Sequence, residues 1–108
     1  MGPFVAAAND VVEIRLRGRY FAEPASVQIT IAVEPTAEFR RLRVEAESDE
    51  MLRSSEVTLD GAAASRIHTL EFKNLMAGDY VLTAQVYSAT DLKAVATQAL
   101  TVNGTGGR

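Results

Sequence analysis

Apolar side chains recur at every second position through most of this chain, and this spacing constrains the fold more than any other feature. In the clearest segment, Val27, Ile29, Ile31 and Val33 alternate with polar or small residues. A period of two places these four side chains on one face of a β-strand, and their branched shape favours extended backbone. The same alternation recurs in six further segments, at residues 12–16, 42–46, 57–59, 68–72, 80–86 and 93–102.

The segment at residues 42–46 is the one place where a helix competes, because residues 36–42 include good helix formers. We prefer a strand there, since the apolar positions keep strict alternation. Turn signals separate the segments. Gly18, Pro24 and Pro35 interrupt the pattern, Asp60-Gly61 is a hairpin-type signal followed by a loop at residues 62–65, and residues 74–79 form a turn.

Each predicted strand has one apolar and one polar face, which is typical of two antiparallel sheets packed face to face. The sequence therefore predicts an all-β, seven-stranded antiparallel sandwich. With 108 residues the chain is expected to be one domain. We assign residues 1–10 to a disordered N-terminal segment, 11–102 to the sandwich and 103–108 to a flexible tail. Residues 6–8 resemble the small-residue end of a signal peptide, but a disordered start and a cloning remnant are alternatives.

A short motif in this sequence resembles immunoglobulin-like and fibronectin type III-like domains of bacterial exported proteins. The resemblance is carried by an apolar strand end, a glycine turn and a tyrosine that opens the next strand: Leu70, Phe72, Leu75, Gly78, Tyr80, Leu82, Ala84 and Val86. It implies an immunoglobulin-like sandwich in which the Tyr80 hydroxyl bonds to backbone a few residues upstream and Leu75 closes the bottom of the core. The chain departs from antibody domains, because it has no cysteine pair and no tryptophan.

Composition limits the chemistry that this chain can perform. Without cysteine there is no disulfide, thiolate nucleophile or zinc–cysteine site, and a net charge of −3 gives no electrostatic reason to expect nucleic acid binding. No stretch approaches the ~20 apolar residues that span a bilayer. His68 is the only imidazole. It is a conceivable general base or metal ligand, but we expect it to be packed or half-exposed on a strand.

Two groups of charged residues are candidate sites. Glu45, Glu47, Asp49 and Glu50 are conceivable calcium ligands, although a solvated strand end is the simpler interpretation. Arginines in two clusters are a conceivable patch for an acidic partner, but we expect ion pairs across strands with Glu13, Glu45 and Glu47. The clusters are Arg15, Arg17 and Arg19, and Arg40, Arg41 and Arg43.

The resulting expectation is a module with no catalytic residues, cofactor or metal. It would serve as a spacer, adhesion or assembly domain of a larger or exported bacterial protein, in the periplasm or outside the cell. Its expected partner is another protein or a neighbouring domain, contacted through turns at residues 48–50, 62–65 and 89–91, and an exposed sheet edge is a further route. The alternative is a carbohydrate-binding module, which needs a row of exposed rings from Tyr20, Phe21 and Tyr87.

Overall fold

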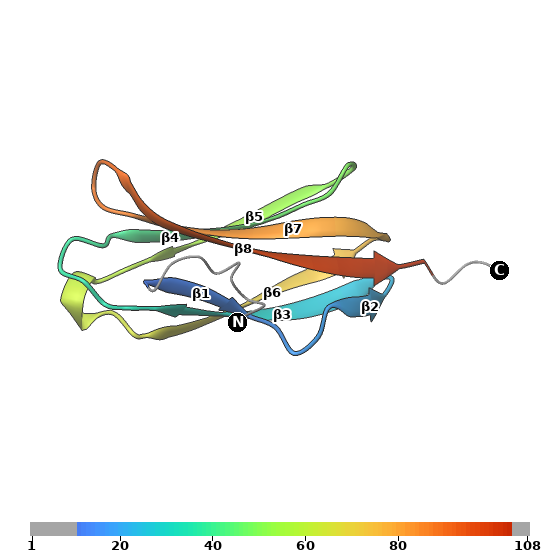
Figure 1. The fold of residues 1–108 in the computed structure, drawn as a ribbon, viewed down its shortest axis with the longest axis horizontal. Coiled ribbons are helices and arrows are strands. Elements are labelled where there is room, and N and C mark those ends of the chain that lie inside the picture. Colours follow the sequence, from blue (N-terminus) through green and yellow to red (C-terminus); the bar gives the residue numbers. More distant parts are fainter. Residues whose placement is uncertain (1–10, 105–108) are drawn as a thin grey trace, which may run out of the picture.

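The computed structural model describes residues 11–104, which form eight β-strands and one short 3-10 turn (Figure 1). The strands are β1 (Val12–Arg15), β2 (Tyr20–Ala22), β3 (Ala25–Val33), β4 (Arg41–Glu47), β5 (Leu52–Thr58), β6 (Ile67–Leu75), β7 (Gly78–Tyr87) and β8 (Leu92–Asn103). The 3-10 turn, Gly61–Ala63, lies between β5 and β6.

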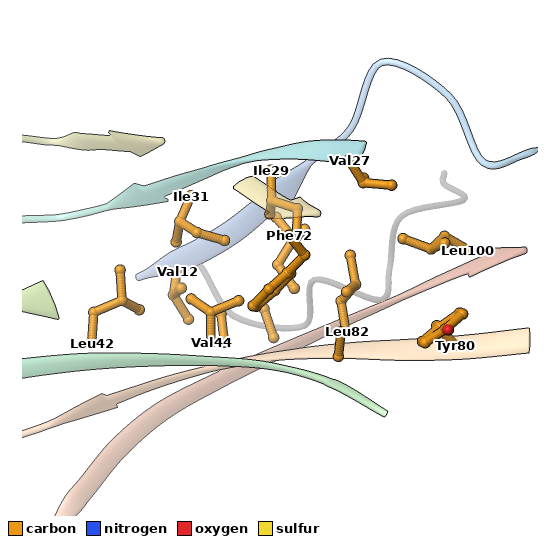
Figure 2. Close-up of a cluster of buried hydrophobic side chains, with 14 of the residues drawn as sticks. Val12, Val27, Ile29, Ile31, Leu42, Val44, Phe72, Tyr80, Leu82 and Leu100 are labelled. Carbon is orange, nitrogen blue, oxygen red and sulfur yellow. The ribbon is translucent and has the colours of Figure 1, made fainter. Parts of the chain in front are cut away.

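Two sheets pack face to face as the alternation predicts. One has three strands in the order β1-β3-β6, and the other has five in the order β2-β8-β7-β4-β5. Side chains from both sheets meet between them (Figure 2), and the fully buried set includes Val27, Ile29, Ile31, Leu42, Val44 and Leu82. No polar or charged residue of the described chain is fully buried. The free energy of folding therefore comes from apolar burial at every second position.

The prediction of seven antiparallel strands is wrong in two respects. An eighth strand, β2, was not predicted, and it pairs in parallel with β8, so the five-stranded sheet is mixed. The cause is that the N-terminal stretch is divided between the sheets. β1 pairs with β3 in the first sheet, and the chain then reaches the second sheet, where Tyr20 stands opposite Thr101. Three residues are too few for alternation to reveal a strand.

The connection after β5 also differs from its prediction. Asp60-Gly61 does not make a hairpin, because β5 and β6 belong to different sheets. Gly61 instead begins the 3-10 turn that carries the chain across the sandwich. β5 is also longer than residues 57–59. Its inner-face positions include Arg53 and Ser55, which stand opposite buried residues of β4, so no apolar alternation marks its first half.

Other predictions hold, or lie beyond what the structure describes. Residues 42–46 are in a strand, β4, and not in a helix. β6 extends to Leu75 and β7 begins at Gly78, so the turn predicted at 74–79 is shorter. Residues 1–10 and 105–108 lie outside the described residues, and Asn103, which we assigned to the tail, is the last residue of β8. No helix in residues 11–104 is long and apolar enough to cross a membrane.

Candidate interaction surfaces

Three loops meet at one end of the sandwich, which we call the loop end: residues 34–40, 59–66 and 88–91 (Figure 1). Backbone hydrogen bonds join the first two of these loops to each other and to the end of β7, where the third loop begins. The Arg40 amide donates to the Tyr87 carbonyl at 2.8 Å, and the Gly61 amide donates to the Phe39 carbonyl at 3.2 Å. The Leu59 amide donates to the Arg40 carbonyl at 2.9 Å. Arg40 thus links the 34–40 loop to the start of the 59–66 loop and to the end of β7.

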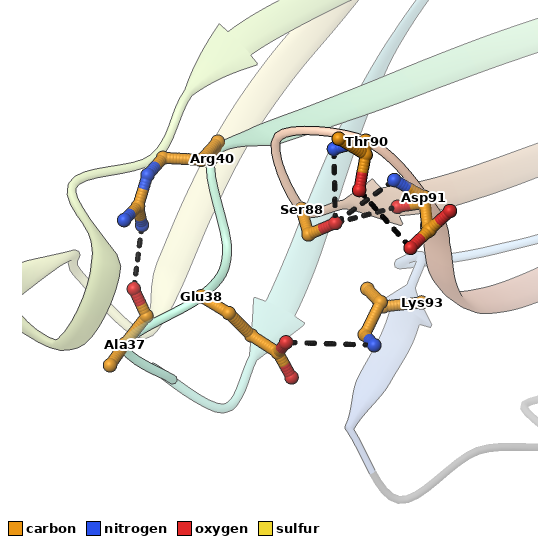
Figure 3. A network of polar contacts seen from close by, with 7 residues as sticks. All are labelled: Ala37, Glu38, Arg40, Ser88, Thr90, Asp91 and Lys93. Carbon is orange, nitrogen blue, oxygen red and sulfur yellow. Dashed lines mark hydrogen bonds and ion pairs between the residues drawn. The ribbon is translucent and has the colours of Figure 1, made fainter.

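Side chains fix the same loops further (Figure 3). The Ser88 Oγ accepts hydrogen bonds from the amides of Thr90 at 3.2 Å and Asp91 at 2.9 Å, which sets the β7–β8 turn. Lys93 Nζ lies 3.5 Å from Glu38 Oε1 and connects the start of β8, just after this turn, to the 34–40 loop. The loop end therefore presents exposed side chains on a backbone that is already ordered.

A shallow hollow of about 360 Å³ opens at the loop end and is lined by Ala37, Arg40, Leu59, Asp60, Gly61 and Ala62. Arg40 Nη1 donates to the carbonyls of Ala37 at 2.6 Å and Phe39 at 3.0 Å. Within residues 11–104 the Arg40 guanidinium has no carboxylate partner, so its charge is not neutralised by an ion pair. Gly61 has a φ of +54°, and an added Cβ would lie 3.0 Å from the Ala37 carbonyl oxygen.

The structure brings together two of the three turns that we predicted as contact surfaces. Residues 62–65 and 89–91 both lie at the loop end, whereas residues 48–50 close the β4–β5 hairpin at the opposite end (Figure 1). In that hairpin the Ser48 Oγ accepts from the amides of Glu50 at 3.3 Å and Met51 at 3.2 Å. Sequence spacing could not show which turns share an end, because this depends on where the chain changes sheets.

The predicted tyrosine bond is present at the end opposite the loops. Tyr80 is buried, and its hydroxyl donates to the Met76 carbonyl at 2.7 Å, four residues upstream. Leu75 is fully buried beneath it. These residues hold the β6–β7 connection against the core and confirm the two local predictions that the sequence motif implied.

The charged residues of the five-stranded sheet form ion pairs on its outer face, but the expected pairing across strands with Glu45 is wrong: Glu45 pairs within β4, and the partner across strands is Glu56 of β5, which we missed. Arg43 Nε lies 2.8 Å from Glu45 Oε2, and Arg43 Nη1 lies 3.2 Å from Glu56 Oε2. Arg41 is 3.9 Å from the same Glu56 carboxylate and stacks over the Tyr87 ring, 4.4 Å from its centroid. Hydrogen bonds to Glu45 and then Glu56 raise the pKa of the Arg43 guanidinium above its usual range.

The two arginine clusters do not make one patch. Arg15 is in β1 of the three-stranded sheet and pairs with Glu13 of the same strand at 3.2 Å, not across strands. Arg41 and Arg43 are in β4, on the other sheet. The acidic residues expected at a solvated strand end are half-buried or exposed. Within residues 11–104, no group of three or more His, Cys, Asp or Glu side chains is placed to hold a metal ion.

His68 is half-buried on β6, as expected. It stands opposite Ile31, so its ring is on the inner face, and its Nε2 is buried without a hydrogen-bond partner among the described residues. The three candidate rings for sugar stacking do not form a row. Tyr20 stands opposite Thr101 and Tyr87 opposite Leu92, at the two ends of β8, and the Tyr87 ring is covered by Arg41.

Comparisons with solved structures find similar folds at low sequence identity. Two variants of superoxide reductase (neelaredoxin) from Ignicoccus hospitalis are 15% and 16% identical, with TM-scores of 0.67 and 0.68. The matches cover 94% and 93% of this chain, and 92% and 85% of those chains. The CARDB domain of a Pyrococcus furiosus protein, in complex with di-metal ions, is 17% identical with a TM-score of 0.59, covering 88% of this chain and 93% of that chain.

Comparisons with protein-family models and with curated protein sequences find no match. The similarity to these solved structures therefore gives information about the fold only. They agree with an all-β architecture, and one fold shared by an enzyme and a CARDB domain does not distinguish catalysis from binding.

Proposed function

We propose that this chain is a non-catalytic interaction module that presents the loop end to another protein or to a neighbouring domain. The observation that carries the proposal is the hydrogen bonding that orders the 34–40 and 59–66 loops around Arg40, beside a β7–β8 turn that Ser88 holds in place. Ordered loops lose little conformational entropy on binding, so more of the contact energy is retained as affinity. The chemistry would be contact alone, with the two sheets acting as the scaffold.

The finer description is also part of this proposal. The buried Tyr80 and its bond to Met76 support an immunoglobulin-like or fibronectin type III-like sandwich, because this arrangement fixes the corner between two strands in such domains. The likeness to a CARDB domain supports the same assignment at the level of fold. We further propose that the module belongs to a larger or exported bacterial protein and works in the periplasm or outside the cell.

Charge and exposure at the loop end suit a protein partner. The exposed residues there include acidic Glu38 and Asp60 and basic Arg40 and Arg66, so neither sign dominates. Arg40 is the group best placed to act, because its charge has no carboxylate partner within residues 11–104 and its guanidinium is held by backbone carbonyls. A planar guanidinium held in one position is well suited to bind a partner's carboxylate with two hydrogen bonds.

Site-specific photo-crosslinking tests this proposal. A photoreactive amino acid is introduced at Ala62 or Ala89, which are exposed at the loop end, and as a control at Gln28, which is exposed on the outer face of β3. We expect irradiation of cells that make the protein to give an adduct of one defined mass at Ala62 and Ala89, identified by mass spectrometry, and none at Gln28. Equal adducts at all three positions, or none at the loop end, would contradict the proposal.

Activity assays test the non-catalytic part separately. The purified protein is expected to accelerate neither the loss of superoxide nor the turnover of a panel of hydrolase substrates above the rate in protein-free buffer with the same divalent metal ions. Turnover that disappears in His68→Gln, the variant lacking the only imidazole, would show that the chain is an enzyme.

A further inference from the structure

The four outer strands of the two sheets differ in how well they are protected. The long unpaired edge of a sheet is a template for another strand, and proteins usually shorten, bend or cover it. β1 and β2 are only four and three residues long. In β6, Lys73 and Asn74 bulge opposite Ser26, Asn74 has a φ of +57°, and the Lys73 carbonyl accepts a hydrogen bond from Arg53 at 3.1 Å.

β5 is neither short nor bent along its outer edge, and its protection is charge alone, from Glu56 on the outer face and Arg53 on the inner face. Its seven residues contain no proline or glycine, and they pair with β4 in an unbroken register. The Ser48 amide donates to the Met51 carbonyl, and the Leu59 amide donates to the Arg40 carbonyl. The backbone N–H and C=O groups of odd-numbered residues in this strand therefore point toward β4. Because the direction of these backbone groups alternates along a strand, the N–H and C=O groups of even-numbered residues point away from β4, past the edge of the sheet. These residues are Leu52, Ser54, Glu56 and Thr58, and all four are exposed.

On the outer face of β4, next to this edge, basic and acidic side chains occupy different halves of the strand. Arg41 and Arg43 occupy one half of β4 and share Glu56 of β5, so this half has one net positive charge, whereas Glu45 and Glu47 give the other half two negative charges. If a second copy lies antiparallel alongside β5, the basic half of each copy is level with the acidic half of the other. Parallel addition would align like charges. The pattern is therefore complementary to itself under a two-fold rotation, which is the symmetry of most homodimers.

We propose that two copies of this chain associate through antiparallel pairing of their β5 strands, with the two-fold axis beside Ser55. This surface is separate from the loop end, so the inference stands independently of the proposed function. The two five-stranded sheets would become one continuous sheet, and every outward amide and carbonyl of Leu52, Ser54, Glu56 and Thr58 would gain a partner.

The register follows from the side chains. With Ser55 on the axis, Ser54 lies opposite Glu56 of the second copy, and Leu52, which is 59% exposed, lies opposite Thr58. A shift that placed the two Glu56 side chains directly opposite each other would bring like charges together. In the proposed register they are diagonal neighbours, and each carboxylate stays close to its own Arg43, at 3.2 Å.

Sedimentation equilibrium of the full chain tests the pairing, over concentrations from about 10 μM to about 1 mM, because a small edge interface gives modest affinity. We expect the mass to rise toward twice that of the monomer. Ser54→Pro removes an outward N–H without breaking the β4–β5 ladder, a position where edge strands tolerate proline, and it should abolish association with an unchanged far-ultraviolet spectrum. The matched control is Thr69→Pro on β6, whose backbone also faces outward, and it should still associate.

A monomeric chain at the highest concentration would overturn the proposal, and so would association that survives in folded Ser54→Pro or that Thr69→Pro removes. Cross-linking gives a second measurement that does not depend on proline. The chain has no cysteine, and two Ser55 residues on the axis form a close pair about 4.5 Å apart at Cα, within reach of a disulfide. Oxidised Ser55→Cys should become a covalent dimer and Thr69→Cys should not. If both variants or neither form covalent dimers, the proposed pairing with Ser55 on the axis is wrong.

Discussion

Tyr80 shows how one side chain can fix a connection between two sheets. Its ring is buried in the core, while its hydroxyl reaches the Met76 carbonyl at 2.7 Å and the Met51 sulfur at 3.3 Å. It therefore joins the β6–β7 connection to the end of the β4–β5 hairpin. Both the residue and its backbone bond were predicted from the resemblance to immunoglobulin-like domains, in which a tyrosine that follows a glycine turn makes such a bond.

Tyr80→Phe keeps the buried ring and removes only these polar contacts. We expect it to lower the free energy of unfolding by about 1 kcal/mol, the usual net value of such a hydrogen bond, measured by urea denaturation. Tyr87→Phe is the control, because no hydrogen bond from its hydroxyl is found within residues 11–104. Its effect should stay within about 0.5 kcal/mol. Equal losses from the two variants would mean that the Tyr80 bond does not stabilise the corner.

Gly61 carries a constraint of a different kind. Its φ of +54° is costly for any other residue except asparagine or aspartate, and a Cβ would meet the Ala37 oxygen at 3.0 Å. Gly61→Ala should therefore destabilise the protein by about 1–3 kcal/mol in thermal or urea unfolding. Gly18→Ala, where a Cβ meets nothing within 4 Å, should change stability by less than about 0.5 kcal/mol. A neutral Gly61→Ala variant would show that the loop end can shift to accept the methyl group.

At the scale of strands, the alternation of apolar and polar residues predicted a strand wherever one of its faces is buried. β3 and β7 were predicted because their inner faces are continuous apolar rows. The first half of β5 was not predicted. An outer strand needs few apolar residues, and the inner face of β5 carries Arg53 and Ser55. The ion pairs between the β4 arginines and Glu56 were missed for the same reason. Glu56 is recognisable as their partner only when β5 is known to lie beside β4.

Two neighbours on β7 test which face of that strand is buried. Leu82 is fully buried between the sheets, whereas Val81 is 50% exposed on the outer face. Leu82→Ala should cost about 2–5 kcal/mol of unfolding free energy, the range for a large core side chain replaced by alanine. Val81→Ala should cost no more than about 0.5 kcal/mol. Reversed magnitudes would mean that β7 is shifted by one residue, which exchanges its two faces.

For the whole molecule, sequence patterns indicate two layers but not how the chain is divided between them. Local alternation is the same for a strand in either sheet, so the crossings after β1, β2, β3, β5 and β6 cannot be predicted from it. Those crossings decide that residues 62–65 and 89–91 share the loop end and that residues 48–50 do not. The candidate surface was therefore predictable as separate turns, but not as one site.

The parallel pairing of β2 with β8 has a mechanical consequence. These strands are close to opposite ends of the described chain, and they run in the same direction over Tyr20–Ala22. A force that stretches the chain from both sides would slide one strand along the other. Hydrogen bonds that lie across the direction of pull must then rupture together rather than one after another, so this small patch would resist extension more strongly than a hairpin opened from its tip.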